Sequence, residues 1–138
     1  MNVENAVLPK GEQMQALLAM GGEGPIVMLN LLKFRDKAQY DEPGEPEMTG
    51  REAYDRYGRV MAPLVLSKGG RLRFSSTVDA LVIGEVGELW DVVAIMEYPS
   101  RAAFVEIATS PEVIEIGRHR KAGLAGQLLI QCSEAPGR

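Results

Sequence analysis

Residues 24–35 read GPIVMLNLLKFR, and this stretch decides the fold because it has the apolar composition of a buried β-strand. Alternate side chains of a strand point to opposite faces of its sheet. The apolar residues of this run fall on both faces, with Ile26, Met28 and Leu32 on one and Val27, Leu29 and Leu31 on the other. Both faces of the sheet that contains this strand therefore need cover.

Turn residues and periodic apolar residues divide the rest of the chain into further elements. The expected helices cover 11–20, 49–66 and two short segments between 100 and 123. The expected strands, after the first at 26–34, cover 71–86, 89–98 and 126–132. The segment 35–48 is rich in proline, glycine and charge, which predicts a long surface loop.

Local signals support the two central elements. Thr49 and Glu52 form the S/T-x-x-E pattern of a capping box, which begins the helix over 49–66, and Pro63 is expected to bend or shorten its last turn. The runs 71–86 and 89–98 are joined by EVGE, which is typical of an antiparallel hairpin, and Asp79 is an alternative end for the first run.

The order strand, helix, strand, strand, helix, strand is the split βαβ arrangement of an α+β, ferredoxin-like fold. We expect one domain over residues 1–138, with a four-stranded antiparallel sheet, helices on one face and an extra N-terminal helix. One layer of helices covers one face only. A second copy packed face to face would cover the other, so we expect a homodimer whose two sheets form a barrel-like core.

Composition narrows the function classes. The net charge of -4 and the pI near 5.1 leave no basic excess for nucleic acid. No apolar run approaches the roughly 20 residues of a membrane span, and no signal peptide is visible, so we expect a cytoplasmic protein. One cysteine and one histidine do not make a zinc site, and no glycine-rich loop opens a helix, so no metal and no cofactor are expected.

Three segments resemble a known bacterial family. YDRYGRVMAPLVLSKGGR (54–71), LVIGE (81–85) and WDVVAIMEYPSRAAF (90–104), the last followed by TSPE, resemble domain of unknown function 1330. Val113 departs from the pattern, in which an aromatic residue usually follows SPE. The resemblance implies the dimeric α+β barrel superfamily, which includes cofactor-free monooxygenases, haem-degrading enzymes, lactone isomerases and ligand-sensing domains. These use a pocket between the sheet and its helices.

Three polar or aromatic residues of the strand regions are candidate ligand-binding residues. Asn30 interrupts the first strand, and a buried amide needs partners, so it either orients a ligand in a pocket or caps a backbone group. Arg73 either binds a ligand or forms an ion pair with Glu97 on the neighbouring strand, and the ion pair is favoured. Trp90, expected at the start of a strand, either packs in the core or stacks on a flat ligand.

Two residues of the helices are candidate catalytic residues. His119 is the only histidine, and its ordinary pKa makes it a natural acid or base near neutral pH. It also suits a structural role at the C-terminal end of a helix, where neighbouring cations would hold its pKa down. Tyr57 lies on the apolar stripe of its helix, so it either packs or offers its hydroxyl to a ligand.

These residues support one leading function and two alternatives. The leading function is a small-molecule-binding protein, in finer terms a cofactor-independent oxygenase or isomerase acting on a planar or enolisable metabolite. There Asn30 and Arg73 would steady an oxyanion while His119 or Tyr57 moves a proton. The alternatives are a non-catalytic homodimer that binds a ligand or partner, and a structural module whose polar residues satisfy one another.

Overall fold

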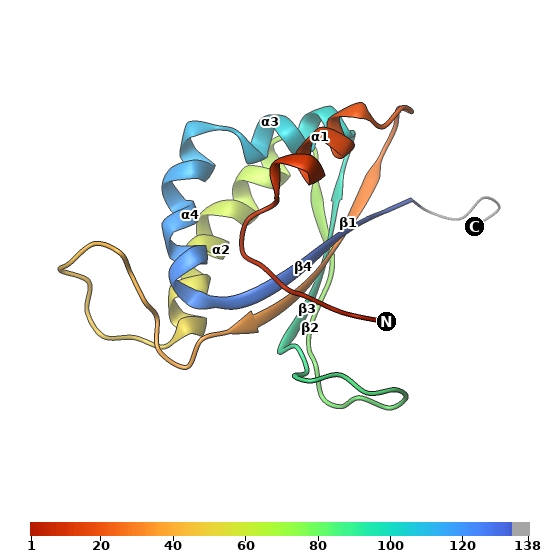
Figure 1. Cartoon of the computed structure of the whole chain (residues 1–138). Helices are drawn as coiled ribbons and strands as arrows, with labels where there is room; N and C mark the ends of the chain where they lie inside the picture. The colour runs from red at the N-terminus through yellow and green to blue at the C-terminus, as the bar shows by residue number, and fades with distance from the viewer. Residues whose placement is uncertain (134–138) are drawn as a thin grey trace.

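The computed structural model describes residues 1–133 and confirms the predicted α+β, ferredoxin-like architecture. In this part of the chain the helices are α1 (Gly11–Ala19), α2 (Gly50–Ser67), α3 (Arg101–Ala108) and α4 (Pro111–Gly123). The strands are β1 (Ile26–Phe34), β2 (Arg71–Thr77), β3 (Val92–Tyr98) and β4 (Leu124–Cys132). The antiparallel sheet has the order β2-β3-β1-β4, and α2, α3 and α4 lie on one side of it (Figure 1). The extra N-terminal helix is α1.

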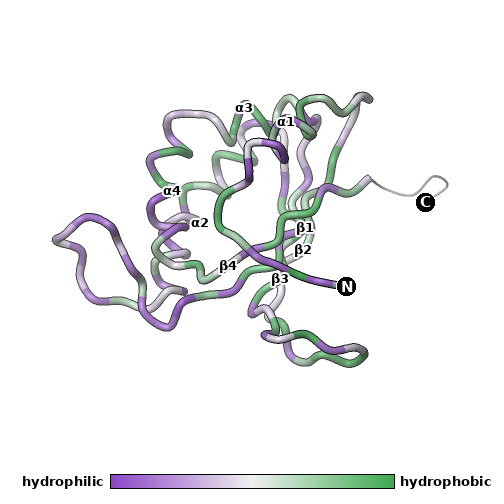
Figure 2. Tube along the Cα trace, viewed as in Figure 1, coloured by the Kyte–Doolittle hydropathy of each residue, from purple (hydrophilic) through white to green (hydrophobic). Residues whose placement is uncertain are grey.

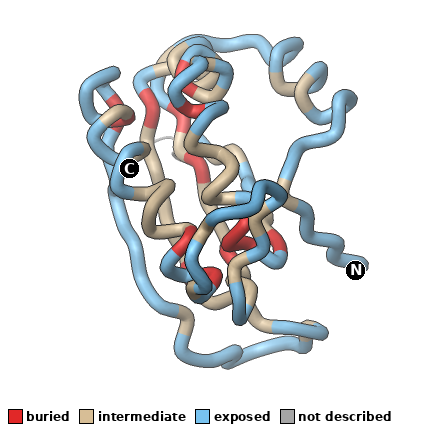
Figure 3. The backbone as a smooth tube through the Cα atoms, turned by 90° about the vertical axis from the view of Figure 1, so that its left-hand side faces the viewer, coloured by how far each residue is buried: buried red, intermediate tan, exposed pale blue. Residues whose placement is uncertain are grey.

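The two faces of β1 differ as the alternation predicted. Ile26, Met28 and Leu32 are at most 4% exposed and pack toward the helices, where they belong to two hydrophobic clusters. Buried positions gather where the helices meet the sheet, while the loops are exposed (Figure 3). Asn30 has the same strand parity as these three core residues, so its amide points into the seam between sheet and helices.

The N-terminal end of α2 meets the C-terminal end of α4 at two glycines. A Cβ on Gly50 would overlap the carbonyl oxygens of Arg35 and Gly123, and one on Gly123 would overlap that of Gly50. The end of β1 is tied to both helices, because Arg35 N donates to Gly123 O (2.8 Å) and Gly50 N donates to Arg35 O (3.1 Å). This close approach fixes the spacing of α2 and α4 above the sheet.

The helix starts follow the sequence signals. Thr49 and Glu52 form the predicted capping box through two hydrogen bonds of 3.1 Å each. The Ser110 side chain caps α4, with Pro111 at the first helical position. Pro63 lies inside α2, and the helix continues to Ser67, so the proline does not end it. No helix among the described residues combines the length and apolar character needed to cross a membrane.

The prediction for the hairpin was wrong in extent. Strands expected over 71–86 and 89–98 are shorter, at Arg71–Thr77 and Val92–Tyr98, and residues 78–91 form a long connection. Its tip is apolar (Figure 2), and Leu81, Val82 and Ile83 are 45%, 88% and 89% exposed. The physical reason is that strand propensity is expressed only where a neighbouring strand supplies partners, and this run has none. Trp90 therefore lies in the connection and not in a strand.

Asp91 closes that connection onto β1. Its carboxylate accepts hydrogen bonds from Phe34 N (2.9 Å) and Lys33 Nζ (3.3 Å). Its backbone N–H donates to Leu32 O (2.8 Å), and its carbonyl accepts from Val78 N (2.9 Å). These four bonds hold both ends of the connection against the sheet.

Candidate functional site

The predicted site residues separate into different parts of the fold. Asn30 and Tyr57 lie between the sheet and the helices, in what we call the inner cluster: Asn30, Tyr54, Tyr57, Arg120 and Gln127. His119 lies in a second group beneath the long loop, which we call the outer cluster: Tyr40, Glu45, Arg56, Arg118 and His119. Arg73 and Trp90 belong to neither group.

Asn30 begins the chain of contacts in the inner cluster. Its Nδ2 donates to Met28 O (3.3 Å) and to Ala94 O on the neighbouring β3 (3.1 Å). Its Oδ1 accepts from Gln127 Nε2 (2.9 Å) on β4, on the other side of β1. Every hydrogen bond of this amide is therefore made to a protein group, and the side chain ties three strands together.

Gln127 connects Asn30 to Arg120 on α4. Its Oε1 accepts from Arg120 Nη1 at 2.8 Å. The Arg120 guanidinium also lies over the Tyr57 ring, 6.0 Å from the ring centre. Arg120 is partly buried, and within residues 1–133 it forms no ion pair with a carboxylate.

Two tyrosines of α2 complete the inner cluster. The Tyr54 and Tyr57 rings lie 5.6 Å apart at a tilt of 47°. Burial raises the pKa of both hydroxyls, and the positive charge of Arg120 opposes that rise in each case. Neither hydroxyl has a hydrogen-bond partner in the described part of the chain. Both phenols therefore remain protonated at neutral pH and are available as donors.

The outer cluster fastens the loop between β1 and α2. Glu45 accepts from Arg56 Nη1 at Oε2 (2.7 Å) and from Arg118 Nη1 at Oε1 (3.0 Å). The Tyr40 hydroxyl is 2.7 Å from His119 Nδ1, and Arg56 Nη1 donates to the Tyr40 oxygen at 3.3 Å. One carboxylate thus joins the two helices, and one phenol joins the loop to the histidine.

Contacts within the outer cluster lower the pKa of Glu45 and of His119 and raise that of Arg56 and of Arg118. Hydrogen bonds from Arg56 and Arg118 hold the pKa of Glu45 below its usual range. The pKa of His119 is lowered by burial first, and then by the charges of Arg118 and Arg56. The direction predicted for His119 is confirmed, although burial contributes more than the neighbouring cations. In the neutral His119 tautomer that carries its proton on Nε2, Nδ1 accepts a hydrogen bond from the Tyr40 hydroxyl.

The other two candidate residues lie on β2 and in the connection after it. Arg73 forms the favoured ion pair with Glu97 (3.5 Å), which Arg71 also contacts (3.1 Å). Trp90 is partly buried, and its indole Nε1 is enclosed without a hydrogen-bond partner in residues 1–133. No group of three His, Cys, Asp or Glu side chains with metal-binding spacing occurs in those residues.

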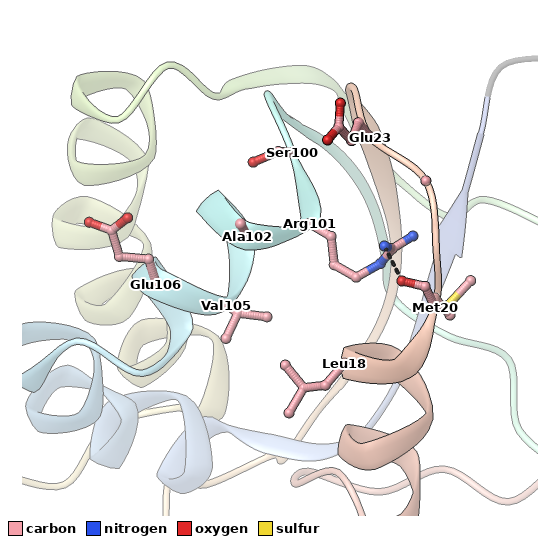
Figure 4. Close-up of a pocket in the computed structure, with 9 residues that line it drawn as sticks. Leu18, Met20, Glu23, Ser100, Arg101, Ala102, Val105 and Glu106 are labelled. Carbon is pink, nitrogen blue, oxygen red and sulfur yellow. Dashed lines mark hydrogen bonds between the residues drawn. The ribbon is translucent and has the colours of Figure 1, made fainter.

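Two open depressions lie on the surface away from both clusters. One, of about 700 Å³, lies between α1 and α3 (Figure 4), where Arg101 Nη1 donates to Met20 O at 2.9 Å. Its apolar lining comes chiefly from Leu18, Ala102 and Val105. The other, of about 740 Å³, lies at the end of β1 near Asp91. Neither depression is lined by a predicted site residue.

Sequence reasoning missed Arg120 and Gln127. Arg120 was hidden in the basic run RHRKAG, where only the helical phase distinguishes it from His119. Gln127 carried a usable signal, because it is a second amide inside a predicted strand otherwise rich in leucine. Pairing β4 with β1 places Gln127 opposite Leu32, on the face that Asn30 also occupies.

Comparison with known proteins first defines the fold class and then the family. No family model and no curated protein matches the chain. A "dimeric protein of unknown function and ferredoxin-like fold" from Bacteroides fragilis has a TM-score of 0.50 at 16% identity, covering 80% of this chain and 96% of its own. That similarity shows the fold alone.

A much closer similarity is to RPA0582, a protein of unknown function from Rhodopseudomonas palustris. The crystal structure of its methylated form has a TM-score of 0.87 at 38% identity, covering 97% of this chain and 98% of its own. A second structure of RPA0582 gives 0.87 at 37% identity, covering 96% and 98%. The chain belongs to the same family as RPA0582. The narrower resemblance to domain of unknown function 1330 stays a prediction.

Proposed function

We propose that this chain is a small-molecule-binding protein whose site is the inner cluster. The observation that carries the proposal is that Tyr54 and Tyr57 are partly buried beside Arg120, yet neither hydroxyl has a hydrogen-bond partner among the described residues. Buried polar groups are normally satisfied, so hydroxyls left without protein partners support a ligand or water in this place.

In its finer form, the proposal is a cofactor-independent oxygenase or isomerase acting on a planar or enolisable metabolite. Two tilted aromatic rings favour a flat molecule, and the raised pKa of Tyr57 keeps its phenol protonated as a hydrogen-bond donor. His119 would act as a base only from the far side of α4, and Arg73 and Trp90 would contact a ligand only from other elements. The alternative is a non-catalytic homodimer that binds the same ligand without turnover.

A thermal-shift screen with aromatic and polyketide-like metabolites tests the site. Ligands that raise the melting temperature should bind Tyr57→Phe about three- to tenfold more weakly, the effect of one lost hydrogen bond. Tyr40→Phe is the matched control, because it removes the same hydroxyl from the outer cluster. Equal weakening by both variants, or the absence of any binding ligand, would contradict the proposal. Oxygen uptake or deuterium exchange into a bound ligand distinguishes enzyme from binder.

We also propose that the protein is a cytoplasmic homodimer joined through the uncovered face of its sheet. Val27, Leu29 and Leu31 face away from the helices, and Ile95 lies beside Leu29 on that face. Figure 1 shows no helix over this side. The related fold from Bacteroides fragilis is described as dimeric. A face-to-face dimer would bury this apolar surface.

Sedimentation velocity tests the dimer. The wild type should sediment as a dimer at micromolar concentration, with an interface above roughly 1,000 Å². Leu29→Glu should convert it to a monomer, because a charge would be buried against the partner sheet. Leu66→Glu is the control, since Leu66 is already 68% exposed on α2. A monomeric wild type would overturn the proposed assembly.

A further inference from the structure

We infer that the ligand of the inner cluster carries a negative charge, as a planar carboxylate or enolate, and that Arg120 is the residue that recognises it. This inference rests on the inner cluster being the ligand site. It assigns a charge class to the ligand and a positioning role to Asn30 and Gln127.

Backbone carbonyls of the sheet fix the orientation of the Asn30 amide, which in turn fixes that of the Gln127 amide. The Asn30 Nδ2 lies between two carbonyl oxygens, those of Met28 and Ala94, and only an N–H group is favourable there. The Asn30 Oδ1 must therefore accept, so Gln127 presents its Nε2 to Asn30. The remaining Gln127 Oε1 then faces Arg120. The backbone carbonyls of two strands, β1 and β3, thus decide which Gln127 atom faces Arg120.

The atom that Arg120 meets is neutral. An amide oxygen orients the guanidinium without cancelling its charge, and no carboxylate within residues 1–133 pairs with it. Arg56, one residue before Tyr57 on α2, and Arg118, two residues before Arg120 on α4, share the Glu45 carboxylate. A partly buried cation without a counter-ion is costly, so an anion that reaches Arg120 gains a favourable partner.

The neighbouring groups favour the same class of ligand. The hydroxyls of Tyr54 and Tyr57 are donors without acceptors, and the Arg120 guanidinium has further N–H groups. Together these groups match an anionic oxygen, which accepts several hydrogen bonds at once. The two tyrosine rings, 5.6 Å apart, add apolar surface beside it. A flat molecule with one carboxylate or enolate oxygen satisfies both requirements.

A matched pair of probes tests the charge class. 4-Hydroxybenzoate and its neutral amide, 4-hydroxybenzamide, differ in the charged group alone, and calorimetry or ligand-observed NMR gives both affinities. The wild type should bind the acid about tenfold or more tightly than the amide. Gln127→Glu supplies Arg120 with a carboxylate of its own, so the acid should lose that advantage while the amide keeps its affinity within about twofold.

Gln131→Glu is the matched control. It makes the same change on the same strand and face, but beside Arg101, whose Nε is 3.4 Å from Gln131 Oε1. This variant should keep the preference for the acid. Arg120→Gln should abolish the preference, and a dispersed NMR spectrum for each variant shows that it is folded.

The outcomes distinguish the charge of the ligand from the location of its site. If the amide and neutral screening hits bind through Tyr57 while the acid binds no better, the charge inference is wrong and the proposed site stands. Equal loss of the preference in Gln127→Glu and Gln131→Glu would also overturn the inference. If neither probe nor any screened molecule binds, the proposed function itself fails.

Discussion

The inner and outer clusters are built from neighbouring residues of the same two helices, yet their charges are arranged differently. Arg56 precedes Tyr57 on α2, and His119 precedes Arg120 on α4. Successive helical residues point about 100° apart, so each pair divides between the seam and the loop side. In the outer cluster one carboxylate joins both arginines. In the inner cluster the arginine meets only an amide.

The difference between the clusters is the position of one acidic residue. Glu45 comes from the long loop, and its hydrogen bonds to Arg56 and Arg118 hold the loop against α2 and α4. No loop brings a carboxylate to the inner cluster in the described part of the chain. Arginine and tyrosine occur in both clusters, so residue type alone does not distinguish a structural contact from a binding site.

The largest expected effect comes from a change that breaks both clusters. Gly50→Ala places a methyl group into the carbonyl oxygens of Arg35 and Gly123, so α2 and α4 must separate. We expect a loss of about 3 kcal/mol or more in the free energy of unfolding, because the overlapped atoms belong to the backbone and yield less than side chains do. Chemical denaturation measures this loss. Gly58→Ala is the control, because its Cβ meets nothing within 4 Å and alanine favours the helix. Equal stability of Gly50→Ala and wild type would contradict the close approach.

A smaller effect should come from the inner cluster alone. Asn30→Leu leaves Gln127 Nε2 without its acceptor and removes the donor to two strand carbonyls. We expect it to cost about 1 to 3 kcal/mol in the free energy of unfolding. Its preference for the benzoate probe should also fall, because Gln127 no longer has a fixed orientation. Unchanged stability would show that these three bonds contribute little to the native state.

The outer cluster should respond to pH instead. The folded pKa of Glu45 lies below its usual value of 4.5, so its stabilising contribution is complete above about pH 4.5 and is lost as the pH falls through the folded pKa. Glu45→Gln removes this contribution, so its melting temperature should fall less steeply than that of the wild type below pH 4.5. If the melting temperatures of the two proteins fell equally steeply with pH, Glu45 would not stabilise the fold through its arginine contacts. Glu47→Gln on the same loop is a control, because Glu47 is mostly exposed.

The smallest effect falls on the single histidine. Glu45 is one of the groups that raise the pKa of His119, against burial and two arginines that lower it. Glu45→Gln should therefore move the pKa of His119 still further below 6.5, which an NMR titration of its ring protons measures directly. A rise would show that the carboxylate does not act on this ring.

The sequence predicted the sheet well because a short periodic pattern carried the information. The alternation from Ile26 to Leu32 divided the strand into two apolar faces, of which the structure buries one against the helices, and Thr49 with Glu52 identified the start of α2. The apolar run at 81–83 misled, since its side chains look like a strand but have no neighbouring strand. Local pattern is informative only where tertiary partners agree with it.

The candidate site was harder to predict because its partners are distant in sequence. Asn30 indicated correctly that its amide needs partners, but its Gln127 partner lies 97 residues away. His119 and Arg120 are adjacent in a run of basic residues, and the helical phase decides which of them faces the sheet. The sequence pattern in that run does not define the phase. The Glu45 carboxylate, which separates the two clusters, lies in a loop without periodicity.

Side-chain NMR of the arginines compares the two clusters most directly. Each Nε–H group gives its own signal, so adding 4-hydroxybenzoate reports which arginine meets the anion. We predict that the Arg120 signal shifts as the probe saturates, that the Arg56 and Arg118 signals stay in place, and that 4-hydroxybenzamide shifts the Arg120 signal less. Shifts at Arg56 and Arg118 with none at Arg120 would place the anion in the outer cluster and contradict the account.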